Sequence, residues 1–118
     1  MSNNQPEYPS DRVHEKFSRA AQALATGTGS IQKRLADAGY HIFAAFIDEG
    51  LPQDMLESYQ EMSAELTKVA DTNIGSVRAT AHTLSDEEAQ RWAGEINSMN
   101  EEIHRRLGIE AGLRKARR

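Results

Sequence analysis

Apolar residues recur three or four positions apart along most of this 118-residue chain, and no other feature of the sequence constrains the fold as much. Residues at these spacings share one face of an α-helix, whereas a strand turns every second residue to the same face. No useful length of the chain alternates with a period of two. The sequence therefore predicts an all-α protein, a compact antiparallel bundle of four helices plus one short helical segment.

The last predicted helix has the clearest boundaries. In SDEE, residues 85–88, Ser85 and Glu88 stand three apart as in a capping box. Apolar residues follow at helical spacing: Ala89, Trp92, Ile96, Met99, Ile103 and Leu107. Gly108 is placed to end the helix, which predicts a helical domain over 10–108 and a basic tail over 109–118.

The first predicted helix begins at Ser10 or Asp11, because serine suits the cap position and an acid suits the first turn. Its apolar stripe consists of Val13, Phe17, Ala20 and Leu24, and TGTG, residues 26–29, ends it. Residues 1–9 are polar with two prolines, so we expect this segment to be disordered.

The second predicted helix runs from the cap Ser30 to a stop at Gly50. Its apolar stripe consists of Ile31, Leu35, Ala38, Ile42, Ala45 and Phe46. Phe43 and Ile47 fall outside that stripe, which makes the helix apolar on more than one side. Such a helix is either central in the bundle or part of a subunit interface, so Phe43 and Ile47 are candidate contacts of a homodimer.

The third predicted helix starts at Pro52 and carries an acidic row opposite its apolar stripe. The stripe consists of Met55, Tyr59, Met62, Leu66 and Val69, and the acidic row of Asp54, Glu57, Glu61 and Glu65. DTNIGS, residues 71–76, is expected to break the helix before a short helical segment around Val77, Ala81 and Leu84.

Several classes of protein are excluded or disfavoured by what the sequence lacks. There is no cysteine, so disulfides, zinc–thiolate sites, iron–sulfur clusters and thiol catalysis are ruled out. The N-terminal residues resemble no signal peptide, and the apolar stretch 42–47 is far too short to span a membrane. We therefore predict a cytoplasmic protein with no membrane contact.

Motifs for catalysis or cofactor binding are likewise missing. The sequence has no Gly-x-Ser-x-Gly elbow and no glycine-rich phosphate loop, so we predict a non-enzyme without a cofactor. Two histidines follow an acid by three positions, in the pairs Asp11–His14 and Glu101–His104. Glu101 and His104 are weak candidates for a carboxylate–histidine metal site, because they lie beside the apolar stripe of their helix rather than within it.

Charge is unevenly distributed along the chain. Residues 1–104 hold eight Lys or Arg against seventeen Asp or Glu, whereas residues 105–118 hold six against one. The six cations are Arg105, Arg106, Arg114, Lys115, Arg117 and Arg118. This segment could be a solvated helix end, an arm that binds nucleic-acid phosphates, or a peptide that docks on a protein.

The docking alternative has a parallel in LGIEAGLR, residues 107–114. These residues resemble the C-terminal cargo-loading peptides of encapsulin cargo proteins, although Glu110 interrupts the pattern and no linker precedes it. Our main prediction from sequence is a non-enzymatic interaction or regulatory protein that binds another protein and forms a homodimer. The alternatives are a nucleic-acid-associated regulator that uses the basic tail, and a carboxylate–histidine metal-binding bundle.

Overall fold

A computed structural model describes residues 4–71 and 75–117 of the chain. Its elements are α1 (Asp11–Thr26), α2 (Ile31–Phe43), the 3₁₀ turn η1 (Asp48–Gly50), α3 (Gln53–Leu66), α4 (Ser76–Ala81) and α5 (Asp86–Ala116). No strand occurs among the described residues, which confirms the predicted all-α class. Part of the predicted break at 71–76, namely 72–74, lies outside the described residues.

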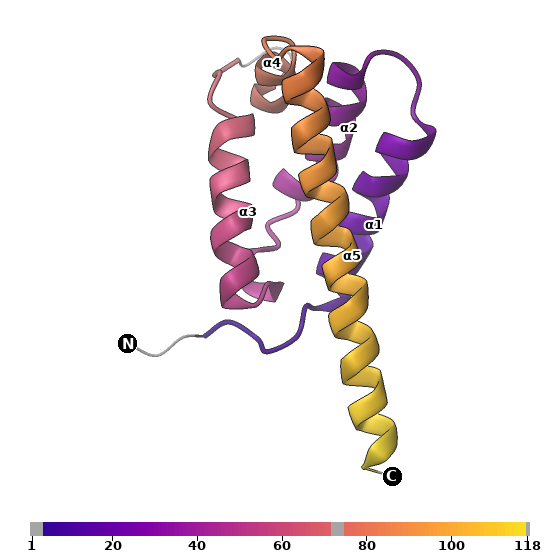
Figure 1. Cartoon of the computed structure of the whole chain (residues 1–118). Helices are drawn as coiled ribbons and strands as arrows, with labels where there is room; N and C mark the ends of the chain where they lie inside the picture. Colours follow the sequence, from indigo (N-terminus) through magenta and orange to yellow (C-terminus); the bar gives the residue numbers. More distant parts are fainter. Residues whose placement is uncertain (1–3, 72–74, 118) are drawn as a thin grey trace.

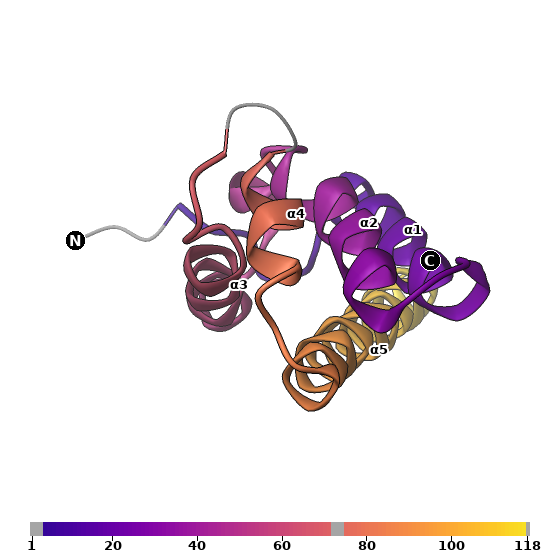
Figure 2. The same cartoon turned by 90° about the horizontal axis from the view of Figure 1, so that it is seen from above.

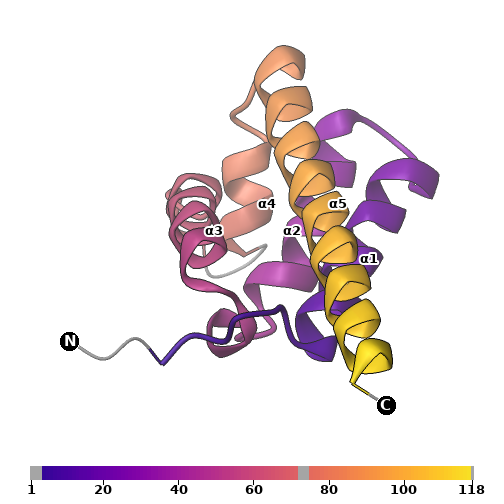
Figure 3. The same cartoon turned by 60° about the horizontal axis from the view of Figure 1, so that its bottom comes forward.

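The helices pack into one bundle, in which α5 is the longest helix (Figure 1). α1 and α2 pack against each other and against α5, while α4 lies between α2 and α3 (Figure 2). α2 and α5 run in the same direction (Figure 1). The last turns of α5 project beyond the other helices (Figure 3).

Side-chain caps fix the starts of three helices where the sequence predicts them. The Oγ atoms of Ser10 and Ser30 accept hydrogen bonds from the third backbone N–H that follows each of them. Ser85 and Glu88 form both bonds of a capping box, at 3.1 and 3.0 Å. These bonds satisfy N–H groups that have no partner within their own helix.

The predicted end of α2 is wrong, because the helix stops at Phe43 rather than near Gly50. The early stop lets the chain turn so that Ile47 and Leu51 enter the core, where they are 2% and 0% exposed. Two side chains from other elements hold carbonyls of this turn. Tyr59 Oη donates to the Ile42 carbonyl at 2.8 Å, and Arg12 Nη2 donates to the Ala45 carbonyl at 2.7 Å.

The predicted end of α5 is also wrong, since the helix passes through Gly108 and Gly112 and ends at Ala116. Neither glycine has a positive φ. A glycine in a helix costs only about 1 kcal/mol relative to alanine. Glu110 and Arg114, one turn apart at 3.3 Å, supply a favourable ion pair across Gly112. Residues 109–116 therefore continue α5.

Every helix except α4 contributes to one apolar core. The largest fully buried apolar side chains are Val13, Phe17, Leu35, Ile42, Ile47, Leu51, Met62, Leu66, Ile96 and Ile103. The N-terminal residues that the structure describes lie against this body. Gln5 Nε2 donates to the carbonyls of Asp48 and Leu51, both at 2.7 Å, and Pro9 is buried.

Candidate functional site

The two residues predicted for a subunit interface lie in different surroundings. Ile47 is buried within its own chain, because the turn after α2 points it inward. Phe43 is half-buried, and its ring centroid lies 5.8 Å from that of Tyr59. The second apolar side of this segment is thus largely covered by the same chain.

Phe43 also borders a groove of about 920 Å³ between α2 and α4. Tyr40 and Val77 line the groove with it, and Tyr40 is 69% exposed. The carboxylate of Asp37 at the groove is already paired with Lys33 at 3.1 Å and with Arg78 at 3.6 Å. The groove is therefore an apolar depression whose one acid is neutralised.

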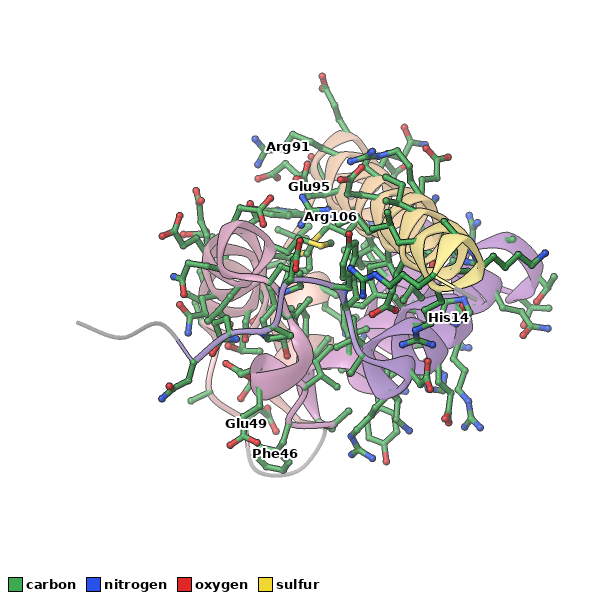
Figure 4. All side chains as sticks on the ribbon, turned by 90° about the horizontal axis from the view of Figure 1, so that it is seen from below. His14, Phe46, Glu49, Arg91, Glu95 and Arg106 are labelled. Atoms are coloured by element: carbon green, nitrogen blue, oxygen red, sulfur yellow. The ribbon has the colours of Figure 1, made fainter. Side chains whose placement is uncertain are left out.

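The most exposed large apolar side chain among the described residues is Phe46, at 87%. Its φ of 53° lies in the left-handed region, which bulky side chains rarely occupy. The acids Asp48 and Glu49 follow it, both exposed and without an ion pair among the described residues. Figure 4 shows Phe46 and Glu49 beside each other at the edge of the molecule. We call Phe46, Asp48 and Glu49 the turn surface.

Contacts on either side hold this turn in place. The neighbours of Phe46 in sequence are tied down, Ala45 through the Arg12 hydrogen bond and Ile47 through burial in the core. Farther along, the Gly50 carbonyl accepts a hydrogen bond from the Ser10 N–H at 3.0 Å. The surrounding structure therefore imposes the left-handed conformation that displays the phenylalanine ring.

Periodicity could not have found Phe46, because it places the residue on the buried stripe of an uninterrupted helix. The stretch IFAAFI, residues 42–47, has more apolar side chains than one helix face can hold. That excess indicated a surface role for some of them. The identity of the outward residue depends on where α2 ends, and no cap residue marks that end.

Three of the arginines predicted to contact a partner are paired with acids of the same chain. Arg106 bridges α5 and α3 with two hydrogen bonds to Asp54, and it also contacts Glu102. Figure 4 shows Arg106 between these two helices. Arg105 makes two hydrogen bonds to Glu102, and Arg114 pairs with Glu110. Of these residues, Arg106 is chiefly a tertiary contact rather than part of a free arm.

The remaining cations lie on the projecting part of α5. Lys115 and Arg117 are exposed and make no ion pair within the described part of the chain, and Arg118 lies outside it. Ile109 and Leu113, one turn apart, are 45% and 43% exposed. Figure 3 shows that this stretch extends past the other helices. We call Ile109, Leu113, Lys115 and Arg117 the α5 end.

The structure does not assemble the metal candidates into a site. Glu101 and His104 are both exposed on α5. The His104 ring instead meets the His14 ring edge-on, with centroids 4.5 Å apart. Among the residues described, no three histidine or acidic side chains are placed to hold a metal ion.

The pKa shifts in the molecule arise from structural contacts. Hydrogen bonds from Arg105 and Arg106 lower the pKa of Glu102 to about 2, and the Arg106 bond lowers that of Asp54. Burial, assisted by the nearby charge of Asp48, raises the pKa of Tyr59 to about 12. Each of these groups is engaged in a bond between or within helices.

Comparison with family models, curated proteins and solved structures found no match to this chain. Within the described ranges, no helix combines the length and the apolar character needed to cross a membrane. The two surfaces defined above, the turn surface and the α5 end, are therefore the features from which a function can be inferred.

Proposed function

We propose that this chain is a non-enzymatic interaction protein that binds another protein through the turn surface, and that it acts as a homodimer. The observation that supports the proposal is Phe46, 87% exposed in a conformation that a phenylalanine rarely adopts. Single exposed apolar side chains are common and need no explanation by themselves. A bulky side chain held in the left-handed region is uncommon, and such strain is often found at functional sites.

The energetics suit an anchor residue. Burying a phenylalanine side chain against a partner contributes about 2 kcal/mol. Aromatic residues are enriched among the few that dominate binding energy at protein interfaces. Asp48 and Glu49 beside the ring add charge at the rim, which influences the choice of partner and the association rate more than the affinity. The turn surface thus suits a partner with an apolar patch bordered by cations.

A photo-crosslinking residue at position 46 tests the proposal in the cells from which the chain comes. We expect a discrete crosslinked product with this residue at position 46, and none with the same residue at position 57, an exposed site on α3. The mass of the product distinguishes a second copy of the chain from a different protein. Absence of any product at position 46 would contradict the proposed function.

A second candidate function is nucleic-acid binding by the α5 end. It is favoured by Lys115 and Arg117, which project from the body without an acidic partner among the described residues. Binding of this kind weakens steeply as salt rises, because phosphate contacts release counterions. A titration with duplex and single-stranded nucleic acid at two salt concentrations, repeated with Lys115→Glu/Arg117→Glu, tests it. Lack of binding by the unmodified chain would eliminate this candidate.

A further inference from the structure

We propose that the partner of the turn surface is the α5 end of a second copy of this chain. This inference rests on the proposed function and specifies which two surfaces meet. The turn surface combines one exposed apolar side chain with two acids, and the α5 end combines exposed apolar side chains with two cations; none of these four charged residues has an ion pair among the described residues. The two surfaces are complementary in both charge and apolar character.

The helical geometry of the α5 end supports this match. Ile109 and Leu113 are four apart and share one stripe with the small residues Gly112 and Ala116. Small residues beside them leave room for a ring to lie on the helix. Arg117 follows Leu113 by four, so it borders the same stripe, and Lys115 lies in the same final turn.

The last turns of α5 project beyond the other helices, so the α5 end of one copy can reach the turn surface of another (Figure 3). Two copies related by a two-fold axis can therefore exchange the contact, the turn surface of each meeting the α5 end of the other. In such an interface residue i contacts residue j and residue j contacts residue i. A closed homodimer then contains the contact twice, so that each substitution removes two contacts.

The N-terminal segment leaves this stripe accessible. Leu113 and Arg117 line a small depression with Pro6, Glu7 and Tyr8, so the segment lies along one side of the projecting helix. Leu113 nevertheless keeps 43% of its surface exposed. No ion pair joins Glu7 to the α5 cations within the described residues, which leaves the cations available for Asp48 and Glu49 of a partner.

Sedimentation equilibrium of the full chain tests the proposal through a charge exchange. One variant carries Asp48→Lys/Glu49→Lys, and a second carries Lys115→Glu/Arg117→Glu. We expect each variant alone to associate at least about tenfold more weakly than the unmodified chain, because like charges then face each other. An equimolar mixture should recover association, because each of the two contacts in the mixed dimer again pairs opposite charges.

A matched control carries Glu57→Lys/Glu61→Lys, the same change of charge on exposed residues of α3. Alone, it should associate as strongly as the unmodified chain, because both the turn surface and the α5 end are intact. Phe46→Ser should weaken the dimer by about a hundredfold, because the substitution removes the anchor from both contacts.

Three results would overturn the inference: a wild-type chain that stays monomeric, a mixture of the two charge variants that does not recover association, or a Glu57→Lys/Glu61→Lys control that associates as weakly as the Asp48→Lys/Glu49→Lys variant. If the chain is monomeric while position 46 crosslinks to a different protein, the homodimer and the choice of partner are wrong, but the proposal that the turn surface binds a protein stands. If the chain binds nucleic acid through Lys115 and Arg117 and does not self-associate, the α5 end serves that function instead. If neither self-association nor a crosslink is found, the proposed function fails as well.

Discussion

Arg106 on α5 and Asp54 at the start of α3 form a bidentate ion pair across 52 positions of sequence, with Nη1 and Oδ1 2.9 Å apart. The Arg106 side chain is only 20% exposed, so solvent screens its ion pair less than it screens an ordinary surface pair. We expect Arg106→Ala to lower the free energy of unfolding by about 1 kcal/mol, measured by urea denaturation. A double-mutant cycle with Asp54→Ala isolates the pair. A coupling energy indistinguishable from zero would show that the two charges act independently.

The same cluster predicts a loss of stability in acid. The pKa of Glu102 is lowered from 4.5 to about 2 by Arg105 and Arg106, and that of Asp54 is lowered chiefly by Arg106. Carboxyl groups with a lowered folded-state pKa stabilise the fold above their unfolded-state pKa, and this stabilisation is lost as pH falls toward the folded-state value. Stability should therefore fall between about pH 5 and pH 2. Arg106→Gln should flatten that slope, and an unchanged slope would assign the acid sensitivity to other groups.

A buried tyrosine should make the fold sensitive to high pH as well. Tyr59 is 3% exposed and donates to the Ile42 carbonyl, and its pKa is raised to about 12 from 10.0. A group with a raised folded-state pKa contributes stability that is present below its unfolded-state pKa and is lost as pH rises through the folded-state value. Unfolding measured between pH 9 and pH 12 should show this loss. Tyr59→Phe should remove the slope and cost about 1 kcal/mol at neutral pH, because the Ile42 carbonyl loses its partner.

Much of the fold could be predicted because its signals are local. Ser10, Ser30 and Ser85 cap helices through hydrogen bonds to residues three positions away, and these bonds depend on nothing else in the chain. The apolar stripes give the buried faces for the same reason. The ends of α2 and α5 could not be predicted, because glycine is permissive and stops a helix only where the surrounding structure favours a turn.

Substituting the α5 glycines tests the continuity of that helix. Gly108 is helical, and a Cβ atom added there would meet no atom within 4 Å. We expect Gly108→Ala to raise the free energy of unfolding by about 0.5–1 kcal/mol and to leave the helical circular dichroism signal intact. Gly39→Ala is the contrasting control, because its Cβ would lie 2.7 Å from Val77 Cγ1 and should destabilise the fold by about 1–3 kcal/mol. A destabilising Gly108→Ala would indicate that the helix ends at Gly108 after all.

The surface residues were harder to predict than the core because their exposure depends on tertiary contacts. The sequence shows that residues 42–47 contain too many apolar side chains for one buried face. It does not show that Arg12 and Tyr59 hold the carbonyls of this turn, which is what directs Ile47 inward and Phe46 outward. The sequence likewise did not show that Arg106 is held within the chain, because its partner Asp54 lies 52 positions away on α3.

Replacing Phe46 with glycine separates its contribution to stability from its contribution to binding. Glycine adopts the left-handed region freely, whereas for other residues this conformation costs about 1 kcal/mol or more of free energy. The ring makes little contact with its own chain, since it is 87% exposed. We therefore expect Phe46→Gly to raise the free energy of unfolding of the monomer by about 1 kcal/mol, measured at a concentration where no association occurs.

The same variant should lose the association or crosslinking partner of position 46, because the anchor is gone. Phe46→Ser is the matched variant: it also lacks the ring but keeps the strained conformation, so it should lose binding without becoming more stable. A gain in stability together with a loss of binding identifies Phe46 as a residue kept for function at the expense of stability. If Phe46→Gly instead destabilises the monomer, the phenylalanine contributes to folding, and the proposal that it serves as a binding anchor loses its main support.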